Sequence, residues 1–120
     1  MKGRLLLVLF SLFVALSFGS NYDVIQLILE FAPGVWTPVH MHGGYILTSP
    51  QEGELTVRDS QGAEKKYKAG ERFVETPGEY LAVGNVGGVK ARLAVVALLP
   101  KGAVLTTNKD GATSQNPPPG

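Results

Sequence analysis

Glycine and proline divide this chain into short apolar segments, and this division is the sequence feature that most limits the fold. Turn-forming residues recur roughly every ten positions, a spacing typical of all-β sandwiches and closed barrels. The segments between them are rich in β-branched residues or alternate apolar with polar side chains. After residue 20, no segment keeps a sustained helical period. We therefore predict strands at residues 24–31, 39–47, 54–59, 63–68, 70–75, 80–86 and 91–99, with a turn at 49–53.

Residues 1–19 have the layout of a secretory signal peptide. Lys2 and Arg4 precede an apolar run at residues 5–16 that only Ser11 interrupts. Small residues follow, and we predict cleavage after Gly19. The alternative is a retained membrane anchor, but a spanning helix needs about 20 apolar residues and this run is shorter. We expect the mature protein to be exported, in the periplasm or outside the cell, without stable membrane association.

The charge balance gives no reason to expect nucleic acid or anionic lipid as a partner. The chain has 11 Lys and Arg against 10 Asp and Glu, and loss of two Lys/Arg with the signal peptide leaves nine against ten. The chain has no cysteine, so we expect the hydrophobic core alone to hold the domain. We assign residues 20–105 to one β-barrel domain. Residues 106–120 are polar and end in prolines, and we predict a disordered tail there.

His40 and His42 are the only histidines in the chain. In a strand, residues two apart point to the same face, and Met41 between them would point the other way. Two imidazoles on one face can bind one divalent metal ion side by side. On spacing alone, a coincidental pair of solvated or hydrogen-bonded histidines is the preferred interpretation, and the neighbouring residues change that preference.

The residues around this pair resemble the first motif of the cupin superfamily, G-(x)5-H-x-H-(x)3-E-(x)6-G. Gly34, His40, His42 and Gly53 stand at the matching positions, and Ile46 stands at that of the glutamate. The resemblance is closest to small single-domain cupins with an H-x-H-G-G element. It implies a small all-β double-stranded β-helix, or jelly-roll barrel.

A later stretch resembles the second cupin motif, G-(x)5-P-x-G-(x)2-H-(x)3-N. Gly70, Gly78 and Asn85 match, whereas Thr76 replaces the proline and Leu81 replaces the histidine. Over both motifs, seven of ten positions match without a gap. The glycines fall where a small barrel needs turns with positive φ.

The resemblance also implies a metal centre inside the barrel, for which this sequence keeps only two of the usual four ligands. Glu75 is the best candidate for a further ligand, and a solvated carboxylate at a strand end is the alternative interpretation. Two histidines and one carboxylate with open positions would suit one divalent ion of Fe, Mn, Zn, Ni or Cu. We expect the ligand pocket to be lined by Trp36, Tyr45, Ile46, Phe73 and Leu81.

Three functions are consistent with these residues. The first is an exported module that binds a metal ion, a small molecule or both inside the barrel, without strong catalysis. The second is a metal-dependent oxidoreductase or isomerase, for example of the dioxygenase type, that uses His40 and His42. The third is an interaction domain for which the barrel is a scaffold. Cupins often pair through edge strands, so the resemblance also implies a homodimer. The sequence names no catalytic residue and no substrate.

Overall fold

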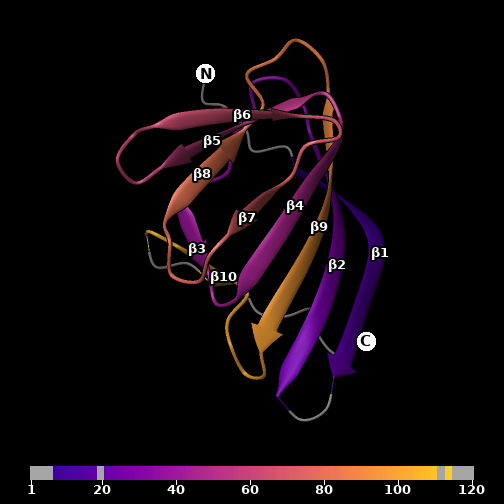
Figure 1. The fold of residues 1–120 in the computed structure, drawn as a ribbon. Coiled ribbons are helices and arrows are strands. Elements are labelled where there is room, and N and C mark those ends of the chain that lie inside the picture. Colours follow the sequence, from indigo (N-terminus) through magenta and orange to yellow (C-terminus); the bar gives the residue numbers. More distant parts are fainter. Residues whose placement is uncertain (1–6, 19–20, 111–112, 115–120) are drawn as a thin grey trace.

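The computed structural model describes residues 7–18, 21–110 and 113–114 of the 120-residue chain. In this part of the chain there are strands and turns but no helix, and the strands form two antiparallel sheets that face each other (Figure 1). The predicted all-β class is therefore confirmed. Among the residues described, none form a helix long and apolar enough to cross a membrane.

One sheet has five strands in the order β1-β2-β9-β4-β7, and the other has six in the order β11-β10-β3-β8-β5-β6. From β2 to β10 the chain passes repeatedly from one sheet to the other, which is the winding of a jelly roll. The strand bounds are β1 (Leu7–Phe18), β2 (Tyr22–Phe31), β3 (His40–His42), β4 (Tyr45–Glu52), β5 (Glu54–Asp59), β6 (Glu64–Lys68), β7 (Phe73–Glu75), β8 (Leu81–Gly84), β9 (Ala91–Pro100), β10 (Thr106–Asn108) and β11 (Thr113–Ser114).

The core lies between the two sheets and is built by strands that alternate buried and exposed residues. Strand β9 lies in the middle of its sheet, between β2 and β4, and every second residue from Ala91 to Leu99 is buried. Burying one large aliphatic side chain stabilises a fold by roughly 1.5–3 kcal/mol. The largest apolar side chains that are fully buried here are Phe31, Ile25, Ile46, Leu55, Leu93 and Leu99.

The glycines of the two motif stretches lie at turns, as the resemblance implies. Gly34, Gly53, Gly70 and Gly78 all have positive φ, between 72° and 92°. Gly53 is the most constrained of the four, because a Cβ there would also lie 2.6 Å from the carbonyl oxygen of Lys90. A side chain at position 53 would strain the backbone and collide with the segment that leads into β9.

The predicted strand at 39–47 is two strands in the structure, β3 and β4. They are separated by Gly43 and Gly44, where the chain crosses from one sheet to the other. A Cβ at Gly43 would collide with the carbonyl oxygen of Val104, and one at Gly44 with that of Leu98. The paired glycines therefore let two segments of backbone pass at close range beside the histidines.

The predicted turn at 49–53 is wrong except at Gly53. Strand β4 continues through Pro50 to Glu52, and its pairing with β9 shifts register between these two residues. A proline removes one hydrogen bond from a ladder, so strands accept it at such an irregularity. Pro50 therefore causes a local irregularity in the pairing of β4 with β9 and does not end the strand.

Residues 106–110 are attached to the barrel, although the sequence predicts that a disordered tail begins there. Strand β10 pairs with β3 from Thr106 to Asn108, and the backbone N–H of Lys109 donates to the carbonyl oxygen of Val39 at 2.8 Å. Ladder hydrogen bonds hold this strand, so its polar composition gave no signal of it. Residues 111–112 and 115–120 of the predicted tail lie outside the described residues.

Strand β1 lies within the segment predicted as a signal peptide. It pairs with β2 and forms the outer edge of the five-stranded sheet (Figure 1). The cleavage position predicted after Gly19, and residues 1–6, lie outside the described residues. Removal of residues 1–19 would make β2 the edge strand.

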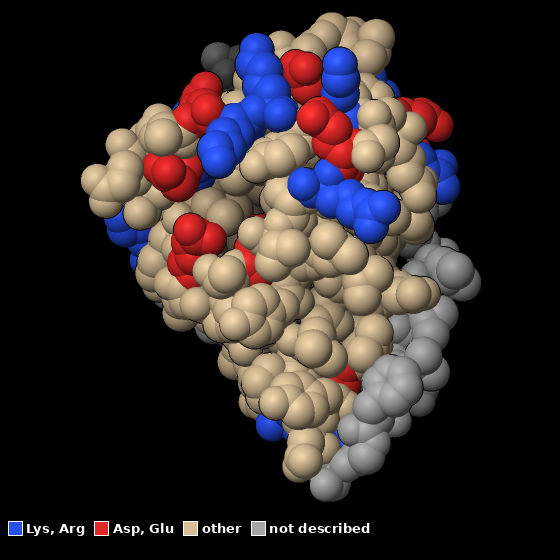
Figure 2. Space-filling model, in the orientation of Figure 1, with Lys and Arg blue, Asp and Glu red and all other residues tan. Residues whose placement is uncertain are grey.

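The outer surface over β4, β7 and β9 is largely apolar. In Figure 2, Lys, Arg, Asp and Glu gather toward the top of the molecule, where β6 lies, and the surface below them is mostly uncharged. Tyr45, Leu47, Val74 and Leu98 are exposed there. Strand pairing places Tyr45 beside Leu98 and Leu47 beside Val74. These side chains point away from the barrel interior.

Candidate metal centre

His40, His42 and Glu75 converge from strands of opposite sheets. Strand β3 carries both histidines and β7 carries the glutamate. Glu75 Oε1 lies 3.3 Å from His42 Nε2 and 3.8 Å from His40 Nε2, and the two imidazole centroids are 4.8 Å apart. The side chains are largely buried, with exposed fractions of 8% for His40, 13% for His42 and 6% for Glu75.

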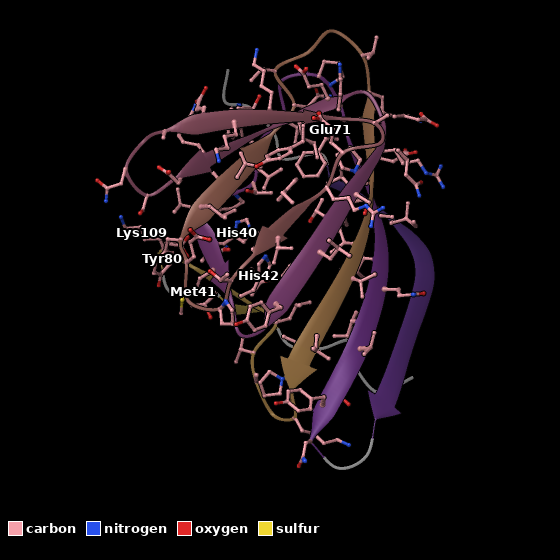
Figure 3. The ribbon with its side chains drawn as sticks, viewed as in Figure 1. His40, Met41, His42, Glu71, Tyr80 and Lys109 are labelled. Atoms are coloured by element: carbon pink, nitrogen blue, oxygen red, sulfur yellow. The ribbon has the colours of Figure 1, made fainter. Side chains whose placement is uncertain are left out.

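Strand geometry explains why these three side chains meet. His40 and His42 both point from β3 into the space between the sheets, and Met41 points to the other side (Figure 3). Phe73 and Glu75 are likewise two residues apart in β7, and both are buried, whereas Val74 between them is exposed. Because residues two apart share a face, Glu75 follows Phe73 into the interior.

Backbone carbonyl groups fix the orientation of both imidazoles. The Nδ1–H of His40 donates to the carbonyl oxygen of Pro38 at 2.7 Å, and that of His42 donates to Leu105 at 2.8 Å. A carbonyl oxygen only accepts, so the proton of each neutral ring is on Nδ1. The hydroxyl of Thr106 lies 3.2 Å from His42 Nδ1. This is the outer-sphere arrangement that usually holds metal-binding histidines.

The arrangement leaves three electron-rich atoms facing one another. A neutral imidazole with its proton on Nδ1 carries a lone pair on Nε2, and both Nε2 atoms face Glu75 Oε1. That oxygen is buried and accepts no hydrogen bond, a condition that costs about 1–3 kcal/mol. A divalent cation would satisfy all three atoms. The residues present therefore fit a metal ion.

Burial lowers the pKa of His40 below its ordinary value. The neighbouring His42 lowers it further, whereas the hydrogen bond to Pro38 and the charge of Glu75 act in the opposite direction. The net lowering keeps His40 neutral at pH 7. Neutral imidazole is the form that binds a metal ion.

The carboxylate of this cluster comes from a different strand than the cupin motif implies. Ile46, at the motif position of the glutamate, pairs directly with Glu75 across β4 and β7. Residues paired in register lie side by side on the same face of a sheet. The carboxylate is therefore displaced by one strand, from β4 to β7. At the position of the third histidine, Leu81 pairs with His40 and offers only hydrocarbon.

A cavity of about 380 Å³ opens beside the three side chains. His40, His42 and Glu75 form part of its wall. Ile46 and Phe73, both predicted as pocket residues, lie in the wall as well. Its other sides are mainly aliphatic and come from β2, β8 and β9, with Leu27, Leu29, Val83, Leu93, Val95 and Ala97.

Three residues predicted for the pocket lie elsewhere. Tyr45 is 54% exposed, because it alternates with the inward-facing Ile46 along β4. Trp36 packs its ring against Gly84 and is covered by the guanidinium of Arg58, 4.3 Å from the ring centroid. Leu81 is buried, but it lines a separate cavity of about 270 Å³ between β5, β6 and β7.

The sequence does not predict the contribution of Leu105 and Thr106 to the cavity and to the orientation of His42. Both residues line the cavity, and both contact His42 Nδ1, Leu105 through its carbonyl oxygen. Backbone acceptors have no residue-specific signature. The apolar pair Val104-Leu105, just before the polar residues, was the available signal for a buried contact.

Comparison with known proteins finds no matching family model and no matching curated protein. Among solved structures, the chain is similar to an oxalate oxidase in complex with the substrate analogue glycolate. That match has 29% identity and a TM-score of 0.54, and covers 62% of this chain and 41% of the oxidase. The aligned part of the chain thus spans 41% of that enzyme's length.

Two further solved structures resemble the chain in fold. One is an uncharacterised conserved protein with a double-stranded β-helix domain from Klebsiella pneumoniae, with 18% identity, a TM-score of 0.60, and coverage of 86% of this chain and 83% of that one. The other is a cupin superfamily protein from Desulfitobacterium hafniense, with 14% identity, a TM-score of 0.60, and coverage of 82% and 84%. These two matches confirm the predicted double-stranded β-helix fold, and the second shows that a protein of the cupin superfamily shares it.

Proposed function

We propose that this cupin-fold chain holds one divalent metal ion through His40 Nε2, His42 Nε2 and Glu75 Oε1, and that it binds a small organic molecule in the adjacent cavity. The observation that carries the proposal is the buried Oε1 of Glu75, which lacks a hydrogen bond and faces two imidazole lone pairs. Two histidines and one carboxylate suit Fe(II) in particular, and also accommodate Mn, Zn, Ni or Cu.

Metal content of the full chain, purified without a histidine tag and measured by mass spectrometry, tests this proposal. We expect close to one equivalent of metal after reconstitution. His42→Ala should lose most of it. Met41→Ala is the matched control on the same strand, because that side chain points away from the cluster. Equal metal content in the two variants would refute the assignment of ligands.

A metal-dependent oxidoreductase or isomerase is the second candidate function. It is supported by the cavity beside the cluster and by the similarity to an oxalate oxidase. A bound metal ion would polarise an oxygen donor of the substrate, and iron, manganese or copper would add redox chemistry. This chain's residues would orient that ion and exclude water from the apolar cavity. Oxygen consumption in a substrate screen, lost in His42→Ala but kept in Met41→Ala, would support this function over simple binding.

We also propose that the protein is exported and that its first 19 residues are cleaved off. It is supported by Lys2 and Arg4 ahead of the apolar run at 5–16 and by small residues around Gly19. Expression with the native N-terminus, followed by N-terminal sequencing of the exported fraction, should give a chain that begins at Ser20. A chain that keeps residues 1–19 would refute cleavage.

A further inference from the structure

The cavity beside the metal centre offers hydrocarbon on almost every side. Among the described residues, its wall contains no Lys, Arg or Gln. Outside the metal centre, its polar side chains are Thr37, Thr48, Thr106 and Asn108. The hydroxyl of Thr37 already accepts a hydrogen bond from the backbone N–H of Val83 at 2.9 Å, and that of Thr106 contacts His42. A ligand therefore meets few polar groups other than the metal centre.

The charge of the occupied centre would limit how much negative charge a ligand can carry. Metal-bound imidazoles are neutral, and Glu75 supplies one negative charge, so a divalent ion leaves a net charge of one positive unit. One anionic oxygen neutralises that charge. A second anionic group out of reach of the ion would be buried without a partner among aliphatic side chains such as Leu93 and Val95, which costs several kcal/mol. A second anionic group that also bound the ion would leave the centre with a net negative charge beside the same aliphatic side chains. The site therefore favours a single acidic group.

The size of the cavity limits the apolar part of the ligand. An apolar cavity of about 150 Å³ is known to hold one benzene molecule. The cavity here, of about 380 Å³, is more than twice as large. It has room for an apolar body of one or two rings. Small dicarboxylates would leave most of this hydrocarbon wall without contacts.

We infer that the ligand is a largely apolar molecule of one or two rings with a single ionisable oxygen, a phenol or an enol, and that dicarboxylates are not its ligands. This inference rests on the proposed metal centre. It separates this chain from the oxalate oxidase to which it is similar, because oxalate has two carboxylates and no apolar body.

Calorimetric titration of the zinc-loaded full chain with three probes tests the inference. The probes are 4-ethylphenol, ethylbenzene, which lacks the oxygen, and succinate, a dicarboxylate that chelates zinc weakly. We expect 4-ethylphenol to bind at least about 10-fold more tightly than either of the others, which is a difference of about 1.4 kcal/mol. Binding of succinate as tight as that of 4-ethylphenol would overturn the inference. So would the absence of 4-ethylphenol binding in protein that carries one equivalent of zinc.

A matched pair of variants locates the binding. Ala97 is buried and lines the cavity, so Ala97→Leu adds bulk inside it. Ala94 lies on the opposite face of β9, so Ala94→Leu adds the same bulk outside. We expect Ala97→Leu to lose 4-ethylphenol affinity at unchanged zinc content, and Ala94→Leu to keep both. Val95→Ile, a smaller change in the cavity wall, replaces Ala97→Leu if that variant does not fold. Unchanged affinity in the cavity variant would place binding elsewhere and overturn the inference.

Zinc content separates the two proposals. A protein that takes up zinc but prefers succinate refutes the ligand class and leaves the metal centre standing. A protein that takes up no zinc refutes the metal centre, and the inferred ligand class falls with it.

Discussion

Replacing Glu75 by glutamine should change stability and metal binding in opposite directions. Without metal, the buried Oε1 of Glu75 has no hydrogen-bond partner and faces the lone pairs of His40 and His42 at 3.8 and 3.3 Å. Glu75→Gln keeps the size of the side chain, removes its charge, and supplies an N–H donor to one Nε2. We expect the metal-free protein to gain about 1–3 kcal/mol, the usual cost of an unsatisfied buried polar atom. For a domain of this size, that is a rise in Tm of about 4–8 °C per kcal/mol.

The same substitution should weaken zinc binding by more than about 100-fold, because loss of even an outer-sphere partner costs about 10–100-fold. Urea unfolding in the presence of EDTA measures the first effect, with fluorescence of Trp36, the single tryptophan, as the probe. Calorimetric zinc titration measures the second. Glu52→Gln is the control, since Glu52 is exposed at the end of β4, and its stability should stay within about 0.5 kcal/mol of the parent.

A metal-free Glu75→Gln protein that is less stable than the parent would show that the carboxylate of Glu75 stabilises the metal-free fold. It would mean that Glu75 and a protonated histidine form a stabilising ion pair. In that case the cluster would be a structural element of the barrel and not a preformed metal site.

Three other changes have defined outcomes. Deleting residues 105–120 removes the carbonyl acceptor of His42 Nδ1 and should weaken zinc binding by about 10–100-fold in calorimetry. Deleting residues 115–120 leaves β10 in place and should not change zinc affinity. Equal zinc affinities of the two truncated proteins would contradict the role of Leu105. Gly44→Ala would push a Cβ into the carbonyl oxygen of Leu98 and should cost about 1–3 kcal/mol in urea unfolding. Gly88→Ala meets no neighbour and is its control; a neutral Gly44→Ala would disprove the close approach. Because the folded-state pKa of His40 is lowered, the unfolded chain binds the proton more readily, so the metal-free protein should lose stability as pH falls below about 6.5. His40→Asn should reduce this loss in acid titrations of stability, and an unchanged pH profile would contradict the shift.

Much of the fold could be predicted from the sequence because its signals are local. Strand β5 has the bounds that alternation predicts, and the motif glycines Gly34, Gly53, Gly70 and Gly78 have the positive φ that the turns require. The misjudged segments depend on distant contacts. Pro50 is tolerated by a bulge against β9, and Thr106–Asn108 becomes a strand only because the edge of β3 is available for pairing.

The candidate metal centre could be predicted in part, because some of its features also have local signals in the sequence. His40 and His42 form a local pattern whose shared face follows from strand geometry. The inward direction of Glu75 could have been read from Phe73, which is two residues earlier and apolar. The pairing of Glu75 with Ile46 could not, because register between β4 and β7 depends on the whole sheet. Tyr45 was predicted to face the cavity but faces outward, because the chain crosses from one sheet to the other at Gly43 and Gly44, just before it.

A crystal structure of the zinc-soaked protein, with an anomalous difference map at the zinc edge, would show directly whether His40, His42 and Glu75 bind one ion together. We expect one strong peak at about 2.0–2.2 Å from His40 Nε2, His42 Nε2 and Glu75 Oε1. A map with no peak between these three atoms, or with zinc bound only on the surface, would show that the three side chains do not form a metal centre.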